Sequence, residues 1–490
     1  MRSQLRRLLT TGAAYQFAEA VSKVIALVLL PIYTRHLTPA DYGTAELLLT
    51  SVILASIVVR LGIGEAFVRF HFHDEDPERR RVLARTATGA LLVTTSVAAV
   101  AAAVFATPLS ELMLGEPRPA ELRAAALGLW AFTNLELAYA LLRVDEQARA
   151  YLITSLCNVA LTVALTVWLV VLRDEGALGL VLGNFAASAV VLLGLWWSRR
   201  HLLGFHPGRV DRRALAPMLR FGLPTVPAEV SVFALFVIDR FYLYRVESEE
   251  AAGLYSLSVK LAAVVIFTVR AFQLAWPPLA YSVRDEGEAA RLYARVTTYY
   301  VLFTGLVVAG LALLGRWLLR ILDPQFFPAH EALAWVSLGW ALYGLYLVLV
   351  AMAGRAHVTV RTVPPALAGL AVNVVLLLVL VDPLGIAGAA IALVGAYVVM
   401  LATLHGLTRR VFPVPFEWPR LILVMVVVGG LSAVGELLLP TEGWAGFAGR
   451  AAALALMPLA LWAGGFFSTG ELAAARRLLS RMGLIGVPRG

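Results

Sequence analysis

Among the ionisable side chains inside long apolar stretches of this sequence, six are candidates for a functional site. They are Glu19, Lys23, Arg60, Glu229, Lys260 and Arg270. In a membrane, a charge near the bilayer centre costs upward of about 2.5 kcal/mol, so it normally faces a partner or a polar cavity. Glu19 and Lys23 are four residues apart and therefore share one helix face. Two interpretations follow: ion pairs that hold helices together, or a cavity that binds an ion or a charged ligand.

The composition indicates a membrane protein. Hydrophobic residues make up 60% of the 490 residues and charged residues 15%, with a mean hydropathy of +0.80. Soluble domains carry about 25% charged residues. Apolar runs of about 20 residues, the length that crosses a bilayer, recur at 11–33, 44–67, 85–107, 120–142, 151–172, 177–198, 217–239, 251–275, 296–315, 331–353, 364–381, 385–407, 420–439 and 445–467. The sequence therefore predicts an all-α polytopic protein of about 14 transmembrane helices with the lipid bilayer as its partner.

The distribution of arginine predicts the orientation. The loops on the side of the N-terminus hold 28 arginines, and the opposite loops hold 9. Because positive loops stay in the cytoplasm, both termini are predicted to be cytoplasmic. Cations spread over many short loops also account for the net charge of +9 without a nucleic-acid partner.

The chain resembles itself at an offset of 210 residues. Matching pairs include Gly12 with Gly222, Glu19 with Glu229, Gly43 with Gly253, Arg60 with Arg270, Arg81 with Arg291, and Trp130 with Trp340. Charged residues are scarce, so charged identities in one register indicate a repeat. The repeat predicts two six-helix lobes, 1–205 and 206–415, parallel and related by a pseudo-twofold axis along the membrane normal. Two further helices and a tail occupy 416–490.

The repeat also places the buried charges. At 1.5 Å per residue, Glu19 and Arg60 each lie about 10 Å from the cytoplasmic end of a predicted helix. The repeat duplicates both, which predicts two Glu–Arg pairs at a common depth. Lys23 and Lys260, the only lysines, would then leave a positive cavity suited to a phosphate or pyrophosphate. The alternative is that these pairs only join helices.

Signals for catalysis or metal binding are weak. His71, His73 and Asp74 have ligand-like spacing but lie in an arginine-rich loop without further ligands. The sequence shows no phosphate-binding glycine loop, no nucleophile elbow and no zinc-protease motif. We therefore expect no metal, no bound cofactor, no ATP hydrolysis and no enzymatic activity. The single Cys157 excludes a disulfide framework.

Several motifs resemble a known family. They are Phe221–Pro224 (FGLP), Asp239-Arg240-Phe241, Gly253–Lys260 (GLYSLSVK), Phe272–Pro277 (FQLAWP), Leu30–Tyr33 (LPIY) and Leu37–Gly43 (LTPADYG). Together they resemble the bacterial polysaccharide-transporter family, the flippases of O-antigen, capsule and exopolysaccharide repeat units. That family lies within the multidrug/oligosaccharidyl-lipid/polysaccharide exporter superfamily. For Asp239 and Arg240, an interfacial salt bridge and a substrate contact both remain open.

The resemblance implies alternating access around a central cavity in the bacterial cytoplasmic (inner) membrane. The implied substrate is an undecaprenyl-pyrophosphate-linked oligosaccharide moved to the periplasmic leaflet. Arg60, Arg270 and Lys260 would hold the pyrophosphate, with Lys23 adding positive charge. Glu19 and Glu229, by charge and depth, are candidates for coupling to H⁺ or Na⁺. A polysaccharide polymerase and other assembly proteins are implied partners.

Three alternatives are weaker. A lipid II flippase shares the helix count and the cationic cavity but is disfavoured by the Asp239-Arg240 and Gly253–Lys260 motifs. A cation-coupled small-molecule exporter usually has twelve helices. A polytopic sugar polymerase or ligase generally needs a large external loop, and the outside loops near 108–119 and 316–330 are short.

Overall fold

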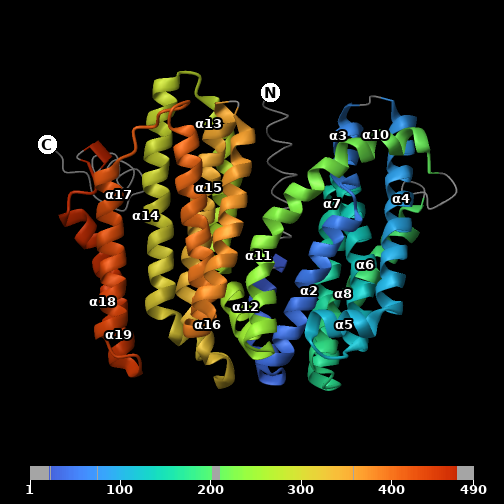
Figure 1. Ribbon diagram of the computed structural model, residues 1–490, viewed down its shortest axis with the longest axis horizontal. Helices are drawn as coiled ribbons and strands as arrows, with labels where there is room; N and C mark the ends of the chain where they lie inside the picture. Colours follow the sequence, from blue (N-terminus) through green and yellow to red (C-terminus); the bar gives the residue numbers. More distant parts are fainter. Residues whose placement is uncertain are drawn as a thin grey trace, which may run out of the picture. The chain divides into compact units, whose positions relative to one another are not determined.

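The computed structural model describes residues 21–22, 24–73, 76–200, 210–356, 358–468 and 470–471. Within these ranges the chain is helical and contains no strand (Figure 1). The longer helices are α2 (Pro39–Val59), α3 (Ile63–His73), α4 (Pro77–Val104), α6 (Pro119–Val144), α7 (Ala148–Val167), α8 (Gly176–Ser198), α10 (Arg212–Gly222), α11 (Val226–Val246), α12 (Glu249–Leu261), α13 (Ala263–Ser282), α14 (Glu286–Leu319), α15 (His330–Arg355), α16 (Val363–Thr408) and α19 (Gly443–Ala463). Short elements include α5 (Ala106–Leu114), α17 (Trp418–Val424) and α18 (Gly430–Leu438).

The predicted fold class is confirmed. Of the described helices, ten are long and apolar enough to span a membrane, or up to 12 if two bent pairs each count as one span. The bent pairs are Arg212–Ser231 with Phe233–Val246, and Glu249–Leu261 with Ala263–Arg270. The chain is thus a multi-pass membrane protein.

Helix α16 accounts for two of the predicted spans. Its 46 residues would extend about 69 Å at 1.5 Å per residue, more than twice the roughly 30 Å of hydrocarbon in a bilayer. Gly385 breaks it with a φ of 52° and a ψ of −132°. This break separates the predicted spans 364–381 and 385–407. Residues 11–20 and 23 of the predicted first span, 11–33, lie outside the described residues, so the count of fourteen stays a prediction.

Besides the bent run 217–239, two predicted helices are wrong as continuous elements. The run 44–67 contains a break after α2, where Leu61 has a φ of 52° and Gly62 a φ of 68°. The run 251–275 bends by 43° between α12 and α13. Apolar residues continue through both breaks, which is why hydropathy alone did not reveal them.

Local sequence explains where helices begin. Thr38 caps α2 in a capping box with Asp41, and Pro39 occupies the first turn, where its missing N–H is no loss. Asp76 caps α4 by accepting a hydrogen bond from the Glu78 backbone N–H, with Pro77 next. These polar N-cap residues determine where the two apolar helices begin.

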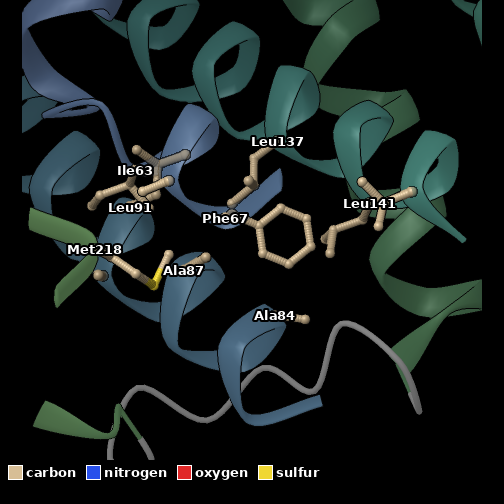
Figure 2. Packing of buried hydrophobic residues seen from close by; sticks show 11 residues of the cluster. Ile63, Phe67, Ala84, Ala87, Leu91, Leu137, Leu141 and Met218 are labelled. Atoms are coloured by element: carbon tan, nitrogen blue, oxygen red, sulfur yellow. The ribbon is translucent and has the colours of Figure 1, made fainter. Parts of the chain in front are cut away.

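The described chain divides into two compact units. The first contains Met1–Lys260 with Ile321–Ala329 and Asn373–Ala389, and the second contains Leu261–Arg320, His330–Val372 and Ala390–Gly490. In the first unit, Phe67, Ala84, Leu137 and Leu141 form part of a core among α3, α4 and α6 (Figure 2). In the second, a core joins α14, α17 and α19. The predicted domain borders at 205 and 415 remain predictions.

Candidate functional site

Arg60 forms an ion pair across the two copies of the predicted repeat. Its guanidinium donates a hydrogen bond to the Glu229 carboxylate of α11, and Glu65 of α3 lies 3.8 Å from the same nitrogen. Arg60 caps the C-terminal end of α2, where the chain turns into α3. One cation therefore faces two carboxylates, and this group carries no net positive charge.

Close backbone contact accompanies this pair. A Cβ on Gly62 would lie 2.5 Å from Gly222 Cα, and its φ of +68° also favours glycine. Arg69 covers the Phe221 ring at 4.4 Å from the ring centroid. We call Arg60, Gly62, Glu65, Gly222 and Glu229 the inner cluster, because the predicted topology places it toward the cytoplasm.

Lys260 has a partner that the sequence argument did not assign. Its ammonium donates to Glu46, whose side chain is only 6% exposed, and lies 5.2 Å from the centroid of the Tyr42 ring. The cation–π contact and the carboxylate together compensate the charge. The two predicted Glu–Arg pairs left Lys260 as an uncompensated positive charge. In the structure, Glu46 compensates this charge.

Asp239 belongs to a buried cluster of polar side chains. It is 2% exposed and accepts a hydrogen bond of 2.7 Å from the Tyr255 hydroxyl. The fully buried Asn373 lies beside it, and the Asn373 amide interacts with the Asp239 carboxylate. Arg240 donates to the Phe236 carbonyl at 3.5 Å and acts on Asp239 electrostatically, although no ion pair among the described residues joins the two. Asp239 and Asn373 thus form a buried polar pair.

A second set of contacts lies at the opposite end of α2. Gly43 of α2 and Gly253 of α12, equivalent positions in the predicted repeat, pack backbone against backbone. A Cβ on Gly43 would lie 2.8 Å from Gly253 N, and a Cβ on Gly253 would lie 3.0 Å from Gly43 N. Two equivalent residues that touch are what a twofold axis passing between them would produce.

Polar bonds surround the glycine contact. Arg118 Nη2 reaches both carboxylate oxygens of Glu249 at 2.8 and 2.9 Å, and Arg118 Nη1 donates to Thr44 Oγ1 at 3.1 Å. The hydroxyls of Thr44 and Tyr244 are 2.9 Å apart. We call Gly43, Thr44, Arg118, Tyr244, Glu249 and Gly253 the outer cluster, since the predicted topology places it outside.

The second unit contains a large apolar cavity. Its volume is about 1070 Å³, and α14, α15, α16, α17 and α18 contribute its walls. Leu, Val and Ala side chains dominate the lining, while Arg316, Glu331 and Glu436 contribute charge. Glu436 pairs with the fully buried Arg450 of α19 at 2.5 Å. Ordinary small-molecule pockets measure roughly 300–1,000 Å³.

The remaining predicted site residues are less defined. Arg270 lies exposed on α13 in the second unit. Glu19 and Lys23 lie outside the described residues, so the second of the two predicted Glu–Arg pairs stays a prediction. Arg60 pairs with Glu229, which joins the two copies of the predicted repeat.

Comparison with known families identifies the chain. The family model described as "Polysaccharide biosynthesis protein" matches residues 9–280, which is more than half of the 490 residues. The chain belongs to this family.

Members with curated names are similar along much of the chain. A "Lsg locus putative protein 1" of Haemophilus influenzae is 25% identical over 352 residues, covering 69% of this chain and 82% of that protein. The "Succinoglycan biosynthesis transport protein ExoT" of Rhizobium meliloti is 26% identical over 324 residues, covering 64% of this chain and 61% of that protein. The resemblance stated from the motifs is therefore confirmed.

Solved structures show the same fold. The "Lipid II flippase MurJ" in an inward closed conformation matches with a TM-score of 0.71 at 13% identity, covering 91% of this chain and 97% of that chain. An inward-facing multidrug resistance transporter of the MATE family matches with a TM-score of 0.64 at 14% identity, covering 80% of this chain and 98% of that chain. At this identity the likeness concerns the fold alone.

Sequence reasoning missed several members of the site in this polysaccharide biosynthesis protein. Glu46 and Glu65 have no charged equivalent in the repeat, so the repeat gave no reason to select them. Arg118 and Glu249 lie at helix ends outside the apolar runs. The Gly43–Gly253 match was the available signal, because two glycines in register predict a close backbone approach.

Proposed function

We propose that this protein is a flippase for undecaprenyl-pyrophosphate-linked oligosaccharides. It would move them from the cytoplasmic to the periplasmic leaflet of the bacterial cytoplasmic membrane by alternating access, with both termini in the cytoplasm. Family membership carries the proposal, and the transport function in the name of the Rhizobium relative supports it. The ion-paired cations of the first unit fit an anionic substrate.

The pyrophosphate would bind by replacing the carboxylates that now pair with the cations of the first unit. Arg60 and Lys260 are occupied by Glu229, Glu65 and Glu46, so an incoming pyrophosphate must replace carboxylates. Arginine suits this exchange because its planar guanidinium binds phosphate oxygens in pairs. Loss of the Arg60–Glu229 bond would also release α2 from α11, which couples substrate binding to opening of the inner cluster. Arg270 and Lys23 would add positive charge along the path.

The apolar cavity of the second unit has a lining that suits a polyprenyl chain. A long isoprenoid needs an apolar surface that stays continuous over several helical turns. The lining of α14, α15 and α16 supplies one, with few charged groups.

The Asp239 group would couple transport to an ion. Asp239 and Asn373, buried side by side, could accept a proton or coordinate Na⁺ through oxygen. Glu229 and Glu19 remain candidates for the same role. The ion pair with Arg60 links Glu229 to the arginine that would bind the pyrophosphate.

Substitution of Arg60 and Arg270, the equivalent arginines of the predicted repeat, tests the proposal. In the natural host, Arg60→Gln with Arg270→Gln should reduce surface polysaccharide at least tenfold, because each change removes a charge-assisted contact worth about 1.5–3 kcal/mol. Membrane levels of the protein, measured by immunoblot, should stay unchanged. Arg200→Gln, an exposed arginine outside both clusters, is the matched control. Normal polysaccharide in the double variant would refute the assignment.

A reconstituted assay separates the substrate classes. Purified protein in liposomes should move a pyrophosphate-linked oligosaccharide between leaflets without any donor sugar. Equal or faster movement of lipid II would favour peptidoglycan precursor transport instead, and sugar turnover without movement would indicate an enzyme.

A further inference from the structure

A small cavity lies in the first unit, apart from both clusters. Its volume is about 200 Å³, and it opens among the ends of α3, α4, α6 and α8. Ala84, Leu141 and Leu142 contribute apolar walls. Ala84 and Leu141 also belong to the buried cluster around Phe67 that Figure 2 shows. The floor is therefore apolar and packed.

The rim of this cavity is predominantly cationic. Arg80 and Arg81 come from α4, and Arg199 follows the end of α8. Against them stand the exposed Asp145, also on the rim, and Glu78, which binds Arg81 at 2.6 Å. Among the side chains that line the opening, three arginines stand against one carboxylate, so the lining favours an anion.

A buried imidazole completes the cavity. His71 lines it with 7% of its surface exposed, and Nδ1 has no hydrogen-bond partner in the described structure. Gln147 Oε1, in the turn between α6 and α7, is likewise buried without a partner. Burial lowers the pKa of His71, Arg80 acts in the same direction and Asp145 opposes it. The neutral imidazole and the amide thus keep hydrogen-bonding capacity that no described side chain uses.

The predicted topology places this cavity on the cytoplasmic side, near the lipid headgroups. Trp197, 77% exposed, precedes Arg199 near the end of α8. Tryptophan and arginine gather at the membrane–water interface, with arginine on the cytoplasmic side. A ligand there would meet cations at the rim and alkyl groups below.

We propose that this cavity, lined by His71, Arg80, Arg81, Gln147 and Arg199, is a binding site for a phosphate ester. Guanidinium groups bind phosphate oxygens, and His71 with Gln147 would bond to the ester or its neighbouring hydroxyl. The chemistry is shared by an anionic phospholipid headgroup and by a soluble phosphate. The site is separate from the transport path and does not depend on the proposed function.

The test measures thermal unfolding of the purified full-length protein in neutral detergent. Phosphatidylglycerol should raise the unfolding temperature, because a ligand that binds only the folded state stabilises it. Phosphatidylcholine, which has no net charge, should raise it far less. Inorganic phosphate and glycerol phosphate form the second arm. A shift with phosphatidylglycerol alone assigns the site to lipid, and a shift with the soluble anions assigns it to a free phosphate ester.

Matched variants link the shift to this cavity. Arg199→Gln and Arg80→Gln with Arg199→Gln should each weaken the apparent affinity by about tenfold or more, as expected for loss of charge-assisted bonds. Arg200→Gln removes a neighbouring exposed arginine outside the cavity and should keep the wild-type shift. The single Arg199→Gln variant covers the case in which the double variant fails to fold. No shift with any anion, or equal shifts in wild type and Arg199→Gln, would overturn the proposal.

Discussion

Gly253→Ala should disrupt the outer cluster. A Cβ at this position would lie 3.0 Å from Gly43 N and closer still to the Pro39 carbonyl oxygen. Even weak C–H···O contacts keep carbon and oxygen about 3.3–3.6 Å apart. Both obstacles are backbone atoms, so no rotamer change relieves them and α2 must separate from α12. Such overpacking costs typically about 1–3 kcal/mol.

The cost falls mainly on the conformation that holds the outer cluster closed. A difference of about 1–3 kcal/mol shifts a two-state equilibrium by about 5- to 150-fold. Labelling of Thr44→Cys by an impermeant maleimide reports the shift, because Thr44 is fully buried in the closed cluster. The exposed Cys157 is first replaced by alanine to remove background labelling. We expect Gly253→Ala to accelerate labelling from the outer side by at least fivefold and to slow polysaccharide export.

The control is Gly194→Ala in α8. An added Cβ at Gly194 meets nothing within 4 Å, so alanine should change neither labelling nor export. Labelling that stays at the parental rate in Gly253→Ala, with normal export, would refute the inference that backbone contact closes this end.

Two other ion pairs give further predictions. Lys260→Met should lower the thermal stability of the purified protein by about 3–5 kcal/mol, because it leaves the buried Glu46 unpaired, and adding Glu46→Gln should recover part of the loss. A double variant no more stable than Lys260→Met would contradict this coupling. Glu436→Gln should leave the fully buried Arg450 without its carboxylate partner and lower the stability by a similar amount. Adding Arg450→Met in the same chain should restore stability. Unchanged unfolding of Glu436→Gln would show that Arg450 is compensated elsewhere.

The sequence predicted the helical membrane fold and the family because both depend on local patterns. Apolar runs identify spans wherever they occur, and the motifs around Asp239 and Lys260 are contiguous. The 210-residue repeat selected Gly43 and Gly253 correctly as a related pair. None of these inferences required knowledge of which helices touch.

Partners of the buried charges could not be predicted in this way. The repeat predicted two Glu–Arg pairs without specifying which glutamate meets which arginine, and Arg60 bonds to Glu229 of the other copy. Such a choice depends on the distance between α2 and α11, which no sequence spacing specifies. Glu46 looked isolated because its partner, Lys260, lies 214 residues away. The turn at Leu61 was not predicted either. Leucine rarely adopts a positive φ, so tertiary contacts and not the local sequence determine this conformation.

The glycine contact has a genetic consequence. Side-chain contacts can be repaired by a complementary change in the partner, as a smaller residue accommodates a larger one. At Gly43 and Gly253 the opposing surfaces are main-chain atoms, and no substitution can make them smaller. Suppressors of Gly253→Ala selected for restored export should therefore arise as true revertants or at distant positions that shift whole helices, and not at the facing residues.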